Sequence, residues 1–202
     1  MPEVLFPADP ATAGAAVAAT RAWLERAVIG LNLCPFAKAV HVKQQIRYAV
    51  TAARNADALL AELEHELQIL AAADPEILDT TLLILPEVMG DFLDFHFFLA
   101  EADAVIRRLE LDGVIQIAGL HPRYEFAGSD ADDIDNYTNR SPYPTLHLLR
   151  EASIDRAVAA FPDAADIFER NIETVRRLGH EGWRRLWLDD AAPDRAGADS
   201  PP

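Results

Sequence analysis

Side chains that could carry out chemistry gather between positions 121 and 147. His121 and His147 could donate or accept protons near neutral pH, where imidazole titrates. Between them, Arg140 could bind a carboxylate or phosphate with two parallel hydrogen bonds, and Asn139 and Ser141 beside it could add others. This grouping predicts a site for a small anionic molecule, with His121 as the acid–base group and Arg140 as the anion-binding group.

The segment that holds these residues is long and irregular, about 25 residues, and such loops in compact domains are usually functional or disordered. Its aromatic content is too high for a solvated linker: Tyr124, Phe126, Tyr137 and Tyr143. Further candidate ligand-binding residues in it are Arg123, Asn136 and Tyr143. Tyr143 or His147 would orient the ligand. We therefore expect a functional loop.

A purely structural loop is the alternative. In that case His121 would tie the loop down through a backbone hydrogen bond. Arg140 would then pair with Asp133 or Asp135 and fasten the loop to itself.

Cys34 is the single cysteine and a candidate nucleophile. If Pro35 begins a helical turn, Cys34 caps it, and the free N–H groups there would favour a thiolate. The alternative is a buried cysteine that behaves as a small apolar residue beside Leu33 and Phe36. Without a second cysteine, a dithiol redox role is disfavoured.

The sequence indicates no metal site and no cofactor. The acidic residues from Asp130 to Asp135 do not have the spacing of a calcium-binding EF-hand. Cys34, His121 and His147 are chemically suited to zinc, but their separation matches no known ligand pattern. No phosphate-binding glycine motif and no familiar hydrolase motif is present.

Hydrophobic patterns predict the elements that position these residues. Residues 45–51 alternate as a half-buried strand, 80–85 form a continuous apolar strand, and 114–118 form a third. Helices capped by Asn55 and Asp91 lie between them. This order predicts an α/β fold: a small, mostly parallel sheet of about three or more strands flanked by helices, with the three strands as parallel neighbours. Ligands of such sheets bind at the carboxyl ends of the strands, where His121 falls.

The pattern of the remaining residues predicts helices. Residues 24–31 have helical spacing, and a C-terminal helical segment includes 146–151, 153–161 and a helix from about Pro162 that ends at Gly179. Trp183 and Trp187 form a docking face after it. We expect one domain over residues 11–189, with flexible termini at 1–10 and 190–202.

Composition excludes several classes of function. The chain has 202 residues, 50% of them hydrophobic, and a formal net charge of −15. A polyanion is repelled by nucleic acid and by anionic membranes, so neither is an expected partner. There is no apolar run that could span a membrane and no secretory signal. With its lone cysteine, the chain is expected in the cytoplasm.

Three motifs together resemble a bacterial family of unknown function, domain-of-unknown-function family 1415. They are GLNLCPFAK near the N-terminus, HPRYEF after the third strand, and DNYTNRSPYPTLHLLRE. The resemblance covers roughly residues 15–187. It implies no reaction, substrate or catalytic residue, so the chemistry must come from the residues themselves.

The leading hypothesis is an enzyme that acts on a small anionic metabolite. The first alternative is a non-catalytic domain that binds or senses a small ligand in the same place. The second is a protein-interaction domain that presents the aromatic loop. Catalysis needs a proton-transfer or nucleophilic group open to a pocket, whereas an interaction domain would show an exposed aromatic patch without one.

Overall fold

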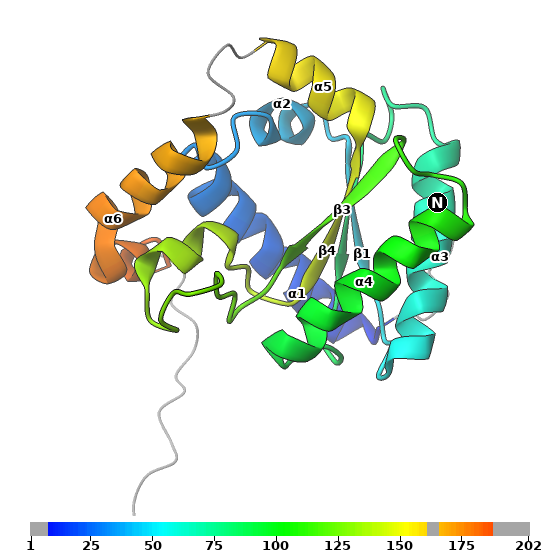
Figure 1. Ribbon diagram of the computed structural model, residues 1–202, viewed down its shortest axis with the longest axis horizontal. Helices are drawn as coiled ribbons and strands as arrows, with labels where there is room; N and C mark the ends of the chain where they lie inside the picture. Colours follow the sequence, from blue (N-terminus) through cyan, green and yellow to red (C-terminus); the bar gives the residue numbers. More distant parts are fainter. Residues whose placement is uncertain (1–7, 161–165, 188–202) are drawn as a thin grey trace, which may run out of the picture.

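A four-stranded mixed sheet with helices on both faces forms the centre of the molecule (Figure 1). The computed structural model describes residues 8–160 and 166–187. The strands are β1 (Ile46–Val50), β2 (Thr80–Ile84), β3 (Ile115–Leu120) and β4 (Thr145–Arg150). Their spatial order is β1-β2-β4-β3. The α/β class is as the sequence predicts.

The fourth strand corrects the predicted topology. Residues 146–151 were expected to be helical, but Thr145–Arg150 forms β4, which lies antiparallel between β2 and β3. The first three strands point in one direction, and β1 and β2 are parallel neighbours as predicted, whereas β3 is separated from β2. Residues 145–150 form a strand because their side chains alternate between the two faces of the sheet. Leu146 and Leu148 are fully buried against the helices, while His147 lies on the opposite face.

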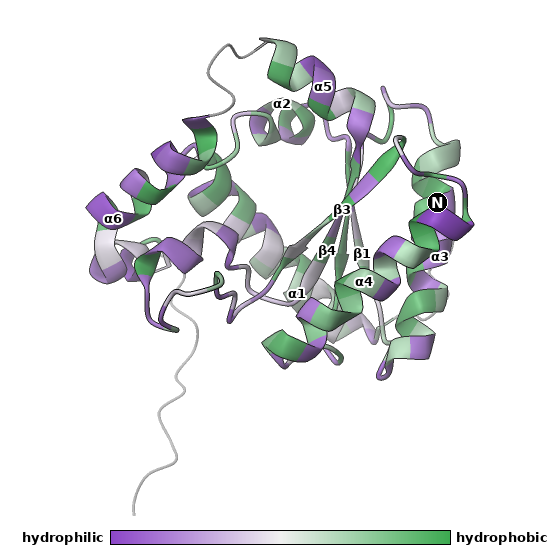
Figure 2. Cartoon of the chain, viewed as in Figure 1, coloured by the Kyte–Doolittle hydropathy of each residue, from purple (hydrophilic) through white to green (hydrophobic). Residues whose placement is uncertain are grey.

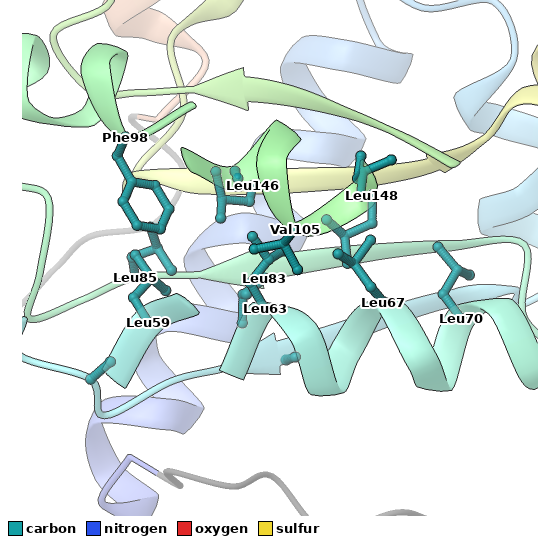
Figure 3. Packing of buried hydrophobic residues seen from close by; sticks show 14 of the residues in the cluster. Leu59, Leu63, Leu67, Leu70, Leu83, Leu85, Phe98, Val105, Leu146 and Leu148 are labelled. Carbon is teal, nitrogen blue, oxygen red and sulfur yellow. The ribbon is translucent and has the colours of Figure 1, made fainter. Parts of the chain in front are cut away.

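Two long helices cover one face of the sheet. Asn55 caps α3 (Ala56–Ala72) and Asp91 caps α4 (Phe92–Arg108), as predicted, through side-chain oxygens that accept backbone N–H groups. Figure 3 shows the leucines of α3 directed at the strands. Residues of this core that are fully buried include Leu59, Leu63, Leu67, Leu70, Leu83 and Leu146. At about 2 kcal/mol for each buried leucine, this layer supplies much of the stability.

Further helices lie on the other side of the sheet: α1 (Pro10–Trp23), the π-helical η1 (Leu24–Ile29), α2 (Ala37–Val42), α5 (Glu151–Ala160) and α6 (Ile167–Arg185). The predicted helix at 24–31 is confirmed as the continuation of α1. Hydrophobic residues predominate in the central strands and hydrophilic ones on α6 (Figure 2). Among the described helices, none combines the length and apolarity needed to span a membrane.

The break predicted at Gly179 is confirmed. Its φ of 66° and ψ of 172° interrupt the helical geometry inside α6, and a positive φ is readily adopted only by glycine. After the break Trp183 is buried, with its ring 5.2 Å from that of Tyr137 and 6.1 Å from that of Trp187. The tryptophans therefore dock the C-terminal turns, as expected. The predicted helix start at Pro162 lies outside the described residues.

A buried ion pair joins β1 to α3. The Arg47 guanidinium donates two hydrogen bonds to the Glu66 carboxylate, at 2.7 and 2.8 Å, and the side chains are only 9% and 0% exposed. Glu66 raises the pKa of Arg47, so the guanidinium stays charged. Because water is excluded from it, either charge would be costly to bury alone.

We expect Arg47→Met to lower the free energy of unfolding by about 3–5 kcal/mol, because it leaves Glu66 buried without its cation. Urea denaturation monitored by circular dichroism measures this. The matched control is Arg184→Met, which breaks the exposed pair between Arg184 and Glu181 and should cost less than about 1 kcal/mol. Equal losses in the two variants would contradict the interpretation.

Candidate functional site

His121 is buried at the carboxyl edge of β3, with both ring nitrogens engaged. Nε2 lies 3.1 Å from the Met89 carbonyl oxygen, and Nδ1 accepts the Arg123 backbone N–H at 3.0 Å. The rings of Phe92 and Phe95 lie 5.4 and 5.3 Å away. Burial lowers the pKa of His121, so the ring is neutral at pH 7. These contacts are those of the structural alternative, in which His121 ties the loop down.

Arg140 also contacts the loop itself. Its guanidinium donates to the carbonyl oxygens of Tyr124, at 3.3 Å, and Ala131, at 2.5 Å, and stacks 4.2 Å from the centre of the Tyr137 ring. The alternative partner Asp135 instead binds Arg176, at 2.6 and 2.8 Å. Arg140 therefore fastens the loop through backbone carbonyls, and its role as an anion-binding group stays a prediction.

The other loop candidates have similar contacts. Asn136 is fully buried: its side-chain oxygen accepts from Phe126 N–H and Ser129 Oγ, and its amide donates to the Asp130 carbonyl. Asn136 thus holds the turn of the loop together.

Four further candidates, Arg123, Asn139, Ser141 and Tyr143, also take part in hydrogen bonds with backbone or side-chain groups near the loop. The Arg123 guanidinium donates to the Gly90 carbonyl, and the Asn139 carbonyl accepts the His121 N–H at 3.3 Å. Ser141 Oγ donates to the Tyr143 carbonyl at 2.7 Å. None of the loop candidates from His121 to Tyr143 is among the residues that line the cavity described next.

A cavity of about 500 Å³ lies on the opposite face of the sheet from α3 and α4. Its apolar wall comes from the end of α1, η1, the turn before α2 and the strands, and includes Trp23, Val28, Leu33, Phe36, Leu82 and Leu120. Its polar residues lie mainly at the start of β1 and β2 and the end of β4. The cavity therefore reaches the amino ends of the parallel strands, whereas the sequence predicted a site at their carboxyl ends.

The cavity brings together two of the predicted catalytic residues, Cys34 and His147. From the sequence, Cys34 was expected at an interruption after the first helix and His147 in a helical segment near the C-terminus. The strand conformation of β4 is what turns His147 onto the cavity face, beside Leu82 of the neighbouring strand. These two residues therefore line the cavity, whereas the role of the loop residues in ligand binding stays a prediction.

Cys34 lies three residues before α2 and is partly buried. Its carbonyl accepts the Ala37 N–H at 3.2 Å, which closes a turn as the sequence suggested. Burial raises the pKa of the thiol, and hydrogen bonds from the Phe36 and Ala37 N–H groups only partly oppose this. The predicted stabilisation of a thiolate is therefore outweighed by desolvation, and the thiol is protonated at pH 7.

His147 is neutral for the same physical reason. Its removal from water lowers the pKa of the imidazole to about 4. Nε2 lies 2.9 Å from the hydroxyl of Thr80 on β2. The strand scaffold thus holds a neutral imidazole in the wall of the cavity.

Charged and polar side chains close the end of the cavity at the amino edge: Lys43, Glu76, Asp79, Arg150, Ser153 and Arg156. Arg150 is held by the carbonyl oxygens of Leu70, Ala73 and Leu78. Ser153 Oγ donates to Asp79 at 2.5 Å and accepts from Arg156 at 2.9 Å. Three cations and two carboxylates line this end of the cavity, and a third carboxylate, Asp74, interacts with Arg150.

Sequence reasoning missed these polar residues and Thr80. Ser153 and Arg156 lie one turn apart on a helix, and this spacing of polar residues is typical of an ordinary solvent-exposed face. A period-two pattern after Pro142 and Pro144 was the signal that could have identified β4. Within residues 8–160 and 166–187, no three His, Cys, Asp or Glu side chains come together in a way that could hold a metal ion.

His147 should make the protein acid-sensitive. Its pKa is about 4 when folded and about 6.5 when unfolded. The stability it contributes is complete above pH 6.5 and is lost as the pH falls toward 4, because only the unfolded chain takes up the proton there. Between pH 7 and pH 5 this group should cost about 2 kcal/mol.

Urea denaturation at the two pH values tests this. His147→Gln should reduce the acid-dependent loss by that amount, while the control His96→Gln, at an exposed histidine, should leave it unchanged. An identical loss in wild type and His147→Gln would refute the assignment.

Comparison with known proteins confirms the resemblance found in the sequence. One family model matches residues 15–185 and so includes all three motifs. No curated protein and no solved structure matches the chain. With most of its length matched, the chain belongs to the family described as "Protein of unknown function (DUF1415)".

Proposed function

We propose that this protein binds a small organic anion in the cavity between the sheet and η1. The observation that carries this proposal is the cavity itself: about 500 Å³ of space with an apolar wall and a few polar groups. Sites for small molecules commonly have this volume and composition. The ligand class follows the hypothesis drawn from the sequence, but its position moves from the 120–147 loop to the sheet face.

A cation at the amino edge of the cavity that has no carboxylate partner among the described residues supports an anionic group on the ligand. Arg150 is already occupied by backbone carbonyl oxygens, and Lys43 lies 3.8 Å from Glu76. Arg156 has only the neutral Ser153 hydroxyl as hydrogen-bond partner among the described residues. It is therefore the cation best able to bind a carboxylate, phosphate or sulfonate. The apolar body of the ligand would extend toward Trp23 and Leu120.

We expect the fluorescent anion 8-anilinonaphthalene-1-sulfonate to bind at one site per chain. Ala157→Trp should weaken binding about tenfold or more, because an indole on α5 fills the cavity that Ala157 lines. Ala159→Trp is the matched control, on the same helix but at an exposed position. Fluorescence titration measures both. Equal affinity in the two variants would place the dye elsewhere and contradict the proposal.

The preference of the cavity for an anion is tested by comparing the sulfonate dye with a neutral analogue in the same titration. N-phenyl-1-naphthylamine has the same ring skeleton without the sulfonate. Arg156→Gln should weaken the sulfonate about fivefold, the value of a partly exposed ionic hydrogen bond. It should leave the neutral amine unaffected.

Catalysis is the second candidate function, and one observation favours it. Cys34 and His147 line the same cavity, so a thiol and an imidazole are both available to one ligand. The thiol would act as nucleophile and His147 would replace His121 as the base. The same cavity without a reaction would serve a binding or sensing domain.

Cys34 should react slowly in the free protein. Because its pKa is raised, we expect iodoacetamide to alkylate it about tenfold or more slowly at pH 7 than it alkylates N-acetylcysteine, with the rate rising as the pH increases. Mass spectrometry follows the reaction. Bound anilinonaphthalene sulfonate should slow it further, and Cys34→Ser should keep the affinity for the dye. A rate above that of the free thiol would show a lowered pKa and overturn this assignment.

The net charge of −15 argues against nucleic acid as a partner. The lone cysteine suits a reducing compartment, and we propose the cytoplasm.

A further inference from the structure

The hydrogen bonds around Thr80 determine where the proton of His147 resides. Thr80 Oγ lies 2.6 Å from the Leu148 carbonyl oxygen and 2.9 Å from His147 Nε2. A carbonyl oxygen can only accept, so the single hydroxyl proton of Thr80 points at Leu148. The hydroxyl oxygen must then accept from His147. The imidazole therefore carries its proton on Nε2, and Nδ1 presents a lone pair.

That lone pair has no partner among the described residues. The imidazole lines the cavity, and the residues directly across from it on the neighbouring strands, Leu82 and Ala118, are apolar. His147 is partly exposed to the cavity, and a ligand that displaces water there would leave Nδ1 without a hydrogen bond unless the ligand brings a donor. A donor brought by a ligand would satisfy Nδ1 inside the cavity.

We propose that Nδ1 of His147 accepts a hydrogen bond from the ligand, so that the cavity selects molecules with a hydroxyl or N–H group on their apolar body. This inference rests on the proposed function and narrows it to organic anions that also carry such a donor. Thr80 is then a positioning residue: it fixes the tautomer of His147 and need not touch the ligand. Molecules that carry only acceptors at that point would leave two lone pairs facing each other.

The tautomer can be measured without any ligand. In ¹⁵N-labelled protein at pH 7, the Nδ1 of His147 should show the shift of an unprotonated imidazole nitrogen, and Nε2 that of a protonated one. Thr80→Val removes the acceptor, so part of the signal should change to the other tautomer. Thr80→Ser keeps the hydroxyl and should behave as wild type. A protonated Nδ1 in the wild-type protein would overturn the inference.

Selectivity is tested with three probes of one skeleton. Isothermal titration should give 2-naphthol an affinity about fivefold to tenfold above that of naphthalene, the value of one neutral hydrogen bond. The affinity of 2-methoxynaphthalene, which has the oxygen but no donor, should not exceed that of naphthalene. The advantage of 2-naphthol should disappear in His147→Phe, fall in Thr80→Val and persist in Thr80→Ser.

The two proposals fail in different ways. If anilinonaphthalene sulfonate binds in the cavity but 2-naphthol shows no advantage, the role of Nδ1 is refuted and the binding function stands. If neither the dye nor the naphthalenes bind, the proposed function is refuted and this inference with it.

Discussion

The pairing of β4 with two strands at once is the interaction on which the rest of the structure depends. Without it, β2 and β3 would each lack a neighbour, and the sheet would be divided. With it, Leu146 and Leu148 complete the core beneath α3 and α4, while the alternate side chains of the same strand face the cavity. One short strand thus contributes both to stability and to the candidate site.

The long loop joins two adjacent antiparallel strands, β3 and β4, which a two-residue hairpin could connect. The sheet does not require its length, and its backbone needs many partners outside regular structure. His121, Asn136 and Arg140 satisfy backbone groups of this segment with their side chains. Residue types that suggest chemistry in a sequence are equally suited to fasten a loop, since both uses depend on strong hydrogen bonding.

Much of the architecture could be predicted because it follows from local rules. The caps at Asn55 and Asp91, the buried stripe of α3 and the apolar run of β2 need no knowledge of distant contacts. By contrast, β4 consists of leucines around a histidine, a pattern compatible with a helix, and only pairing with β2 and β3 decides its conformation. The cavity could not be predicted because its polar wall combines residues from strands and helices that meet only after that pairing.

The position of β4 in the chain has a consequence for folding. During synthesis β1, β2 and β3 emerge first, and β2 and β3 are joined through α4 in the way that normally makes them parallel partners. Direct pairing of β2 with β3 therefore competes with the native sheet. The two strands must remain unpaired with each other until residues 145–150 have been synthesised. Until then two unpaired strand edges are exposed, which favours association between chains. The length of the loop between β3 and β4 thus also prolongs the time for which the nascent sheet remains incomplete.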